Sequence, residues 1–156
     1  MFLGNKDVKI NFNTSNDNDN NPQLTLFVYI DKNRIQQVIF NLLDNASKFT
    51  EKGEITLSII GNDENKNKNN NNSNDKYNNI ITIRIQDTGK GIDSEMLPRL
   101  FKKFATKSER GTGLGLYISK NIIEAHGGKI WTEKTSNGKG TVFVFTLPTT
   151  RNNYTK

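Results

Sequence analysis

The clearest pattern of apolar and polar positions lies between Asp31 and Thr50. At about 100° per residue, its apolar side chains gather on one broad face of a helix. Asp31 is suited to the N-cap position, because its carboxylate can accept a backbone N–H. The pattern predicts a long helix packed on a sheet through Ile35, Val38, Ile39, Leu42, Leu43, Ala46 and Phe49.

Alternation with a period of two predicts strands on both sides of this helix, separated by segments rich in Asn, Asp and Gly. The expected strands cover 8–12, 24–30, 54–60, 80–86, 129–133 and 141–147. Short helices are expected over 95–97 and 99–104. A longer helix, ended by Gly127 and Gly128, has an apolar stripe made of Leu114, Ile118, Ile122 and Ala125.

The order of these elements is strands, helix, strands, helices and strands. It predicts an α+β fold, a two-layer α/β sandwich with a mixed sheet of about five strands packed on about three helices. A chain of 156 residues is the size of one domain. We expect residues 1–156 to form that domain, with a core over about 7–148.

Asparagine makes up more than half of residues 62–79. Such a segment cannot bury enough apolar surface to offset its ordering entropy. We therefore expect 62–79 to be a disordered or extended hairpin insertion between two strands, and 149–156 to be a disordered tail.

Composition excludes several kinds of site. The chain has no cysteine, so it can form neither a disulfide nor a thiolate metal site. Its apolar runs are too short to span a bilayer, and we expect no direct membrane contact. The net charge is +6, but the lysines are scattered and no aromatic residues alternate with them. A nucleic-acid partner is therefore disfavoured, whereas a polyphosphate ligand suits this charge.

A polar stripe runs beside the apolar face of the long helix, made of Gln37, Asn41, Asn45 and Lys48. Asparagine is a poor helix former because its side chain competes for backbone hydrogen bonds. Two asparagines one turn apart, followed by a lysine, are suited to a ligand, since amide oxygens can bind Mg²⁺ and an ammonium group can neutralise phosphate. The alternative is an ordinary solvated helix face.

Asp87 follows a predicted strand and is followed by Gly89 and Gly91. Glycines let a flat group approach the backbone, while the carboxylate accepts hydrogen bonds. Adenine fits such a site because its exocyclic amine is a donor, whereas guanine presents an oxygen at that position. The alternative is a tight turn with a capping aspartate.

A glycine-rich segment opens the later helix: Gly111, Thr112, Gly113, Leu114, Gly115 and Leu116. Free N–H groups and the positive end of the helix dipole can hold phosphate there. The spacing is GxGxG rather than GxGxxG, no strand precedes it, and no Lys-Ser/Thr pair follows. Dinucleotide-binding and P-loop folds are therefore disfavoured.

The segment before these glycines contains two aromatic residues, Phe101 and Phe104, which we expect to anchor the core. Lys107 and Arg110 follow them and are candidates to contact phosphate oxygens, because both are charged. The only histidine, His126, stands at a helix end before a glycine pair. We expect it to bond the last helix carbonyls, and not to accept a phosphoryl group.

The order and spacing of these motifs resemble those of sensor histidine kinases. The resemblance rests on 41-NLLDNASKF-49, 87-DTGKG-91, 101-FKKF-104 and 111-GTGLGL-116. The opening 31-DKNRIQQ-37 and the closing 138-GKGT-141 are similar to the family as well. The resemblance covers most of residues 7–148 and implies the Bergerat ATP-binding fold, which is shared with DNA gyrase, Hsp-type chaperones and mismatch-repair ATPases.

The resemblance implies a role for each matching residue. Asn45 would hold Mg²⁺ with help from Asn41, and Lys48 would bind the phosphates. Asp87 would accept the adenine amine. The base would be lined by Phe49, Gly89, Gly91 and Ile92, with Thr141 near its pocket, and the triphosphate would be wrapped by residues 111–116. Only Ala105 to Arg110 separates the second phenylalanine from the glycines, which is short for the family's ATP lid.

The implied activity is histidine protein kinase activity in a two-component system, with ATP and Mg²⁺ as cofactors. The family's acceptor histidine lies on a dimerising helical hairpin, which this sequence does not contain, so that domain would act in cis or in trans. A response regulator would act downstream. The expected location is the cytoplasm, where the full protein is either free or anchored in a membrane.

Two alternatives remain open: a non-catalytic ATP-binding regulatory module and a gyrase-like ATPase. Gyrase-like relatives carry an acidic base where this chain has Asn41, and an amide cannot take a proton. Transfer to a protein acceptor is therefore favoured over hydrolysis.

Overall fold

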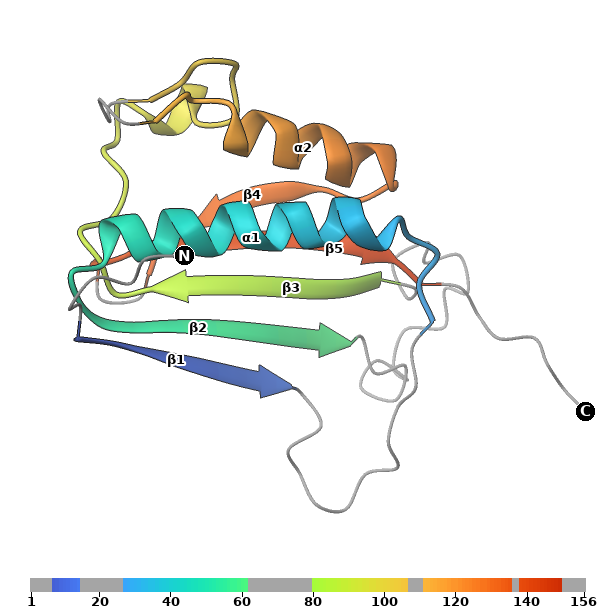
Figure 1. Cartoon of the computed structure of the whole chain (residues 1–156), viewed down its shortest axis with the longest axis horizontal. Helices are drawn as coiled ribbons and strands as arrows, with labels where there is room; N and C mark the ends of the chain where they lie inside the picture. Colours follow the sequence, from blue (N-terminus) through green and yellow to red (C-terminus); the bar gives the residue numbers. More distant parts are fainter. Residues whose placement is uncertain (1–6, 15–26, 62–79, 107–110, 136–137, 150–156) are drawn as a thin grey trace, which may run out of the picture.

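A computed structural model describes residues 7–14, 27–61, 80–106, 111–135 and 138–149. Figure 1 shows their arrangement. The elements in chain order are β1 (Asp7–Thr14), α1 (Lys32–Phe49), β2 (Lys52–Gly61), β3 (Ile80–Asp87), the 3₁₀ helix η2 (Leu97–Arg99), α2 (Gly115–Ala125), β4 (Ile130–Glu133) and β5 (Val142–Pro148). The predicted α+β class is confirmed, and the part of the chain that the structure describes has two α-helices rather than about three.

The strands form one mixed sheet in the order β1-β2-β3-β5-β4. β1 pairs with β2 in parallel, and the other three pairs are antiparallel. A parallel pair needs a crossover connection, and α1 lies between β1 and β2 in the chain. The predicted mixed sheet is therefore a consequence of placing the long helix between the first two strands.

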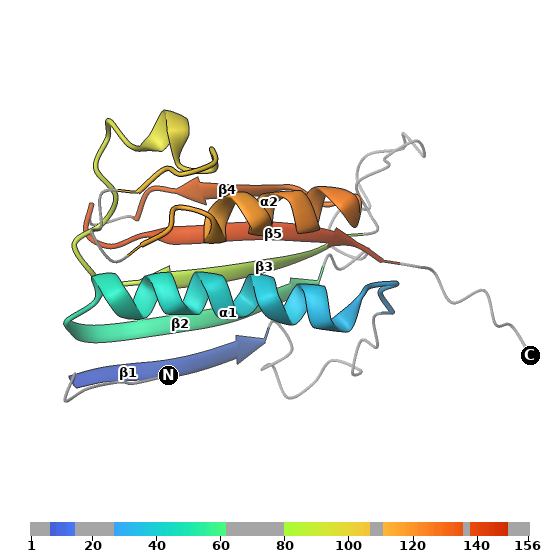
Figure 2. The ribbon, with the colours of Figure 1, turned by 45° about the horizontal axis from the view of Figure 1, so that its top comes forward.

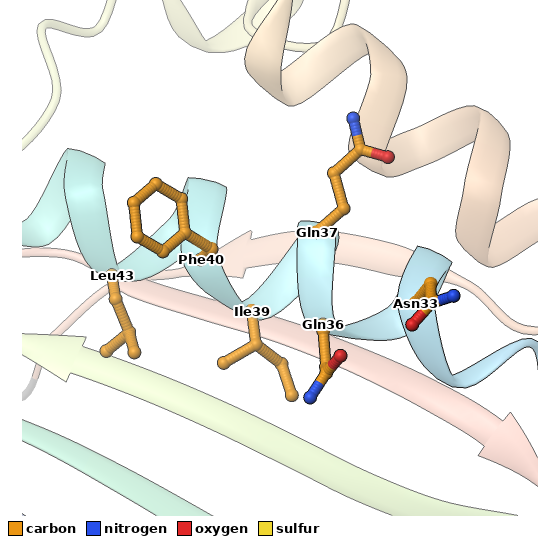
Figure 3. A pocket seen from close by; sticks show the side chains of 6 residues that line it. All are labelled: Asn33, Gln36, Gln37, Ile39, Phe40 and Leu43. Atoms are coloured by element: carbon orange, nitrogen blue, oxygen red, sulfur yellow. The ribbon is translucent and has the colours of Figure 1, made fainter.

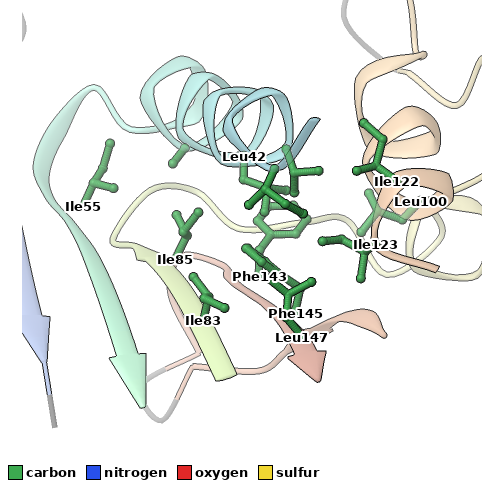
Figure 4. Close-up of a cluster of buried hydrophobic side chains, with 13 residues drawn as sticks. Leu42, Ile55, Ile83, Ile85, Leu100, Ile122, Ile123, Phe143, Phe145 and Leu147 are labelled. Atoms are coloured by element: carbon green, nitrogen blue, oxygen red, sulfur yellow. The ribbon is translucent and has the colours of Figure 1, made fainter. Parts of the chain in front are cut away.

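Both α-helices cover the same face of the sheet and lie beside each other (Figures 1 and 2). The core fills the space between the two layers (Figure 4). It combines alternate residues of β3 and β5 with the inner faces of both helices, and its fully buried members include Leu42, Ile85, Ile123 and Phe145. Each such side chain stabilises the fold by about 1.5–3 kcal/mol relative to exposure.

The long helix follows the predicted pattern closely. The Asp31 carboxylate accepts the backbone N–H of Arg34 at 3.1 Å and caps the helix. Its buried residues are Ile35, Val38, Leu42 and Ala46. Phe49 differs from the prediction, because its side chain is 40% exposed at the last turn. Phe49 lies next to the turn that follows β3 instead of filling the core.

Two predicted elements are not found in the structure. Residues 27–30 of the predicted strand 24–30 form only an isolated bridge at Phe27, and residues 24–26 lie outside the described part of the chain. Tyr29 is 92% exposed and Ile30 packs against the core, so this segment leads into the helix without forming a continuous strand. Insertion 62–79 and tail residues 150–156 also lie outside the described part.

The short helices expected over 95–97 and 99–104 are replaced by one 3₁₀ helix and turns. The amide groups here bond three residues back, as in Leu100 N–H to Leu97 O at 3.4 Å and Lys102 N–H to Arg99 O at 2.8 Å. Phe104 has a φ of 64°, which a continuing α-helix does not allow.

No helix in the described residues has the length and apolarity that a membrane span needs.

Candidate functional site

The polar stripe of α1 faces the start of α2. The side-chain amide of Asn41 donates to the Gly115 carbonyl at 3.3 Å and to Ser119 Oγ at 3.4 Å. The Ser119 hydroxyl in turn donates to the Gly115 carbonyl at 2.9 Å. Two motifs that lie far apart in the sequence are thereby joined, the asparagine stripe and the glycine-rich helix start. The sequence analysis did not identify Ser119. It could have been recognised as a small polar residue on the buried face of an apolar helix.

Both asparagine amides turn their nitrogen atoms toward the protein. Asn45 Nδ2 donates to the Asn41 backbone carbonyl at 2.9 Å, while Asn41 Nδ2 is used at α2. Because the oxygen of a side-chain amide points away from its nitrogen, each Oδ1 is directed elsewhere. Two neutral oxygen donors one helical turn apart suit a hard cation that also binds water and phosphate. These residues therefore fit Mg²⁺.

Lys48 lies on the same stripe and pairs with Asp44. Their Nζ and Oδ2 atoms are 2.6 Å apart, and the two side chains are 55% and 40% exposed. An exposed pair one turn apart on a helix contributes only about 0.5 kcal/mol. The pair can therefore open at little cost when a phosphate group approaches the ammonium.

Asp87 is the buried carboxylate of the site, with 2% of its surface exposed. It stands at the end of β3, where Oδ1 accepts the N–H of Gly89 at 2.8 Å and the N–H of Thr141 at 3.3 Å. Burial raises the pKa of Asp87, and the hydrogen bonds from Gly89 and Thr141 partly oppose that rise. The main chains of Asp87 and Thr141 also bond at 2.9 Å, so Thr141 lies beside the carboxylate.

The turn after Asp87 packs against the end of α1. A Cβ atom on Gly89 would lie 2.3 Å from the Phe49 carbonyl oxygen, which also accepts the N–H of Lys90 at 3.4 Å. The Lys90 ammonium lies 5.2 Å from the centroid of the Phe49 ring. Ile92 packs against the core. The structure thus places Phe49 and Gly89, two of the residues expected to line a base, against each other.

Gly140 lies close to the same turn. A Cβ atom there would be 2.0 Å from the Asp87 carbonyl oxygen, and Gly140 has a φ of 82°. Only glycine fits this close approach and this backbone conformation. The sequence placed Gly140 in a family motif but did not indicate that it touches Asp87.

The glycine-rich segment is held by the residues before it. Phe104 N–H donates to the Gly113 carbonyl at 3.1 Å, and a Cβ atom on Gly113 would lie 2.6 Å from the Phe104 carbonyl carbon. Leu114, the N-cap of α2, makes no side-chain hydrogen bond to cap the helix, while Leu116 packs on the core. In the described part of the chain, the N-cap residue therefore leaves the first amides of α2 without a side-chain cap, which suits an anion. Lys107 and Arg110 lie outside the described residues.

The expectation for the two phenylalanines is half right. Phe101 packs against the core, but Phe104 is 65% exposed. The left-handed backbone at Phe104 turns its side chain outward, where Lys103 lies 5.0 Å from the ring centroid. Phe104 therefore contributes its main chain to the glycine segment rather than its ring to the core.

His126 bonds a carbonyl at the end of α2, as predicted, and it also bonds the start of α1. Its ring nitrogen Nδ1 lies 2.7 Å from the Ile122 carbonyl, and Nε2 accepts the backbone N–H of Asp31 at 3.0 Å. The acceptor role of Nε2 assigns the proton to Nδ1, which donates to Ile122. His126 thus ties the end of α2 to the start of α1.

A shallow hollow of about 450 Å³ lies along α1 and is lined by Asn33, Gln36, Gln37, Ile39, Phe40 and Leu43. Figure 3 shows Ile39 and Leu43 pointing toward the strands, with Gln37 on the opposite side of the helix. The hollow shares only Gln37 with the polar stripe. It therefore does not coincide with the site around Asp87.

Comparisons with known proteins agree with this geometry. Residues 30–151 match the family described as histidine kinase-, DNA gyrase B-, and HSP90-like ATPase. The sensor protein KdpD of Clostridium acetobutylicum is 40% identical over 133 residues, which cover 81% of this chain. The chain spans 13% of the length of KdpD.

Two solved structures are similar over most of the chain. The catalytic domain of the histidine kinase ThkA has a TM-score of 0.67 and 34% identity, covering 92% of this chain and 82% of that one. Full-length ShkA in complex with AMPPNP has a TM-score of 0.67 and 25% identity, covering 91% of this chain and 26% of that one. The chain therefore belongs to the histidine kinase-, DNA gyrase B- and HSP90-like ATPase family, as an ATP-binding catalytic domain of the sensor histidine kinase type.

Proposed function

We propose that this chain binds ATP together with Mg²⁺ and transfers the γ-phosphoryl group to a histidine on a separate dimerisation domain, in cis or in trans. A response regulator then receives the phosphoryl group, and the domain works in the cytoplasm. The observation that supports this proposal best is the hydrogen bond from Asn41 to the Gly115 carbonyl, because it joins the amide stripe to the glycine-rich helix start.

Asp87 is the base-recognition residue of the proposal. Its buried carboxylate accepts the exocyclic amine of adenine. Gly89 and Gly91 let the turn pack closely on Phe49 and Gly140, which holds that carboxylate at the end of β3. Phe49 and Ile92 supply apolar surface to the base. Guanine presents an oxygen in place of the amine, and two acceptors facing each other repel. The proposed preference is therefore for ATP over GTP.

The phosphates lie between the two helices in this proposal. Asn41 and Asn45 hold Mg²⁺ through their amide oxygens, and the bound ion supplies neutralisation of phosphate charge. Lys48 leaves Asp44 to pair with a phosphate oxygen. The uncapped amides at the start of α2 bind the remaining oxygens, with Thr112 and Gly113 beside them.

Transfer to a protein acceptor is favoured because Asn41 occupies the position where a base for hydrolysis would stand. An acceptor imidazole nitrogen attacks the γ-phosphorus, the bond from phosphorus to the β–γ bridging oxygen breaks, and ADP leaves. Asn41 cannot take a proton from water, so hydrolysis is not assisted at that position. Positioning and charge neutralisation then account for catalysis, with no covalent intermediate on this chain.

Mixing the chain with a purified dimerising acceptor domain and γ-labelled ATP tests the proposal. We expect label on the acceptor histidine and little free phosphate. Tight ATP binding without transfer to any acceptor would favour a regulatory module instead. Rapid release of phosphate by the chain alone would favour a gyrase-like ATPase.

A further inference from the structure

β1 stands at one edge of the sheet, where its only neighbour among the described strands is β2. A parallel neighbour bonds the N–H and C=O groups of alternate residues, so the remaining groups of an edge strand point away from the sheet. Folded proteins often protect such an edge by keeping it short, or with a bulge or a proline. β4, at the other edge, has four residues, whereas β1 has eight and stays in register with β2 from Asp7 to Thr14. β1 is therefore the edge that a further strand can join.

Two large apolar side chains of this strand are exposed, Ile10 by 55% and Phe12 by 60%. They stand in register with Ile55 and Leu57, which pack in or against the core, so both lie on the helix side of the sheet. α1 packs on β2 and β3, and β1 lies beyond it (Figures 1 and 2). An exposed apolar stripe thus runs along an open strand edge, which is typical of an interaction surface.

The residue pattern of β1 is complementary to a second copy of itself. A twofold axis perpendicular to the sheet keeps the helix side of both copies on one face, so each residue meets a residue of the same face. With that axis at Asn11, Ile10 faces Phe12 of the second copy, and Phe12 faces its Ile10. Aromatic side chains opposite β-branched ones stabilise antiparallel pairs. The two exposed apolar residues of each copy therefore cover those of the other.

The charges of the strand select this axis over the neighbouring one. With the axis at Asn11, Lys9 faces the neutral Asn13 of the second copy, and the two copies of Lys9 lie about 13 Å apart along the strands. With the axis at Ile10, the two copies of Lys9 would be diagonal neighbours about 7–8 Å apart, where like charges repel. Charge and apolar pattern therefore agree on pairing of residues 8–14 about Asn11.

We propose that β1 pairs antiparallel with β1 of a second copy of this chain, about a twofold axis at Asn11, so that the two sheets become continuous. One pair of strands makes a small interface, so association is reversible, with a Kd of roughly 10–100 µM. Asp87 belongs to β3, which β2 separates from this edge. The pairing therefore leaves the proposed ATP site open, and the inference does not depend on the proposed function.

Sedimentation velocity of the full chain, from about 10 µM to about 1 mM, measures this association. We expect the parent to shift from monomer to dimer over that range. Phe12→Lys replaces an exposed apolar side chain by a charged one and should raise the Kd of the dimer at least about tenfold. Leu97→Lys is the matched control, because Leu97 is also exposed, by 41%, but lies on η2. It should associate as the parent does.

Disulfide formation tests the position of the axis. The chain contains no cysteine, so any disulfide in a single-cysteine variant joins two copies. Only a residue on the axis faces itself, with Cα atoms about 4.5–5.5 Å apart, a separation that a disulfide can span. Asn11→Cys should therefore cross-link in oxidised glutathione at least about tenfold faster than Lys9→Cys or Asn13→Cys alone. An equimolar mixture of the last two variants should cross-link as well, because Lys9 faces Asn13 of the second copy.

The inference is overturned if the parent stays monomeric up to about 1 mM, or if Phe12→Lys associates as strongly as the parent does. It is also overturned if Lys9→Cys cross-links as fast as Asn11→Cys, because random collision would then account for the disulfides. Calorimetric titration with ATP separates this inference from the proposed function. A parent chain that dimerises through β1 but binds no ATP would overturn the proposed function and support the inference.

Discussion

The imidazole Nε2 of His126 accepts the backbone N–H of Asp31 at 3.0 Å, across 95 positions of sequence. Nδ1 of the same ring lies 2.7 Å from the Ile122 carbonyl. One side chain therefore joins the last turn of α2 to the N-cap of α1. The opposite end of this helix pair is joined by Asn41, Gly115 and Ser119, next to the proposed phosphate site. These two links fix the position of α1 relative to α2.

Replacing His126 by alanine removes both ring hydrogen bonds and leaves the Asp31 amide without its acceptor. We expect the free energy of unfolding in urea to fall by about 1–2 kcal/mol. Lys129→Ala, at an exposed position after the same helix, should change it by less than about 0.5 kcal/mol. Equal effects of the two substitutions would show that the link contributes nothing to stability.

Asp87→Asn should weaken ATP binding by about 10- to 100-fold, because the charged acceptor for the adenine amine is lost. The amide can still accept the Gly89 N–H, so the fold should persist. Calorimetric titration of the parent and the variant with ATP gives the comparison. Titration curves that coincide would remove Asp87 from the base site.

The same substitution should change the pH dependence of stability. Burial raises the pKa of Asp87 in the folded chain above its usual value, so the folded state binds this proton more tightly than the unfolded state does. Stability from this group is fully present below the unfolded pKa of about 3.9 and is lost as pH rises through the higher folded pKa. The parent should therefore lose stability relative to Asp87→Asn as the pH rises above about 4 and through the raised pKa of Asp87. Urea unfolding at several pH values measures that difference, and a constant difference would contradict it.

Asn45→Ala should remove the Mg²⁺ dependence of ATP binding, because one of the two proposed amide ligands is lost. ATP affinity in the presence of a chelator should stay near that of the parent. The ATP affinities of the parent and of Asn45→Ala, each measured with and without Mg²⁺, test this prediction. If Mg²⁺ strengthens ATP binding equally in the two, Asn45 does not hold the metal.

Gly140→Ala and Gly138→Ala form a matched pair, since both positions have positive φ, 82° and 70°. A Cβ atom at Gly138 meets nothing within 4 Å, whereas one at Gly140 would be 2.0 Å from the Asp87 carbonyl oxygen. Gly138→Ala should cost about 1–2 kcal/mol of backbone strain. Gly140→Ala should cost about 1–3 kcal/mol more and also weaken ATP binding, because Asp87 must move. Equal losses of stability would contradict the close contact.

The sequence by itself determined the elements whose side chains repeat with a regular period. The helix from Lys32 to Phe49 and the strands from Lys52 to Gly61 and from Ile80 to Asp87 follow from burial of every third or fourth, or every second, side chain. Burial of one face is a local property, so a local pattern can specify it. The same reasoning failed at Phe104, because a left-handed backbone turned an aromatic residue out of the core.

Only the tertiary structure decided which polar atoms lie together. Asn41 reaches Gly115 across 74 positions, and His126 reaches Asp31 across 95. Thr50 Oγ1 is buried next to Gly89 and has no hydrogen-bond partner among the described residues, which residue types could not show, since threonine at a helix end is ordinary. The physical reason is that a hydrogen bond depends on distance and direction between elements, and those are set by how helices and strands pack.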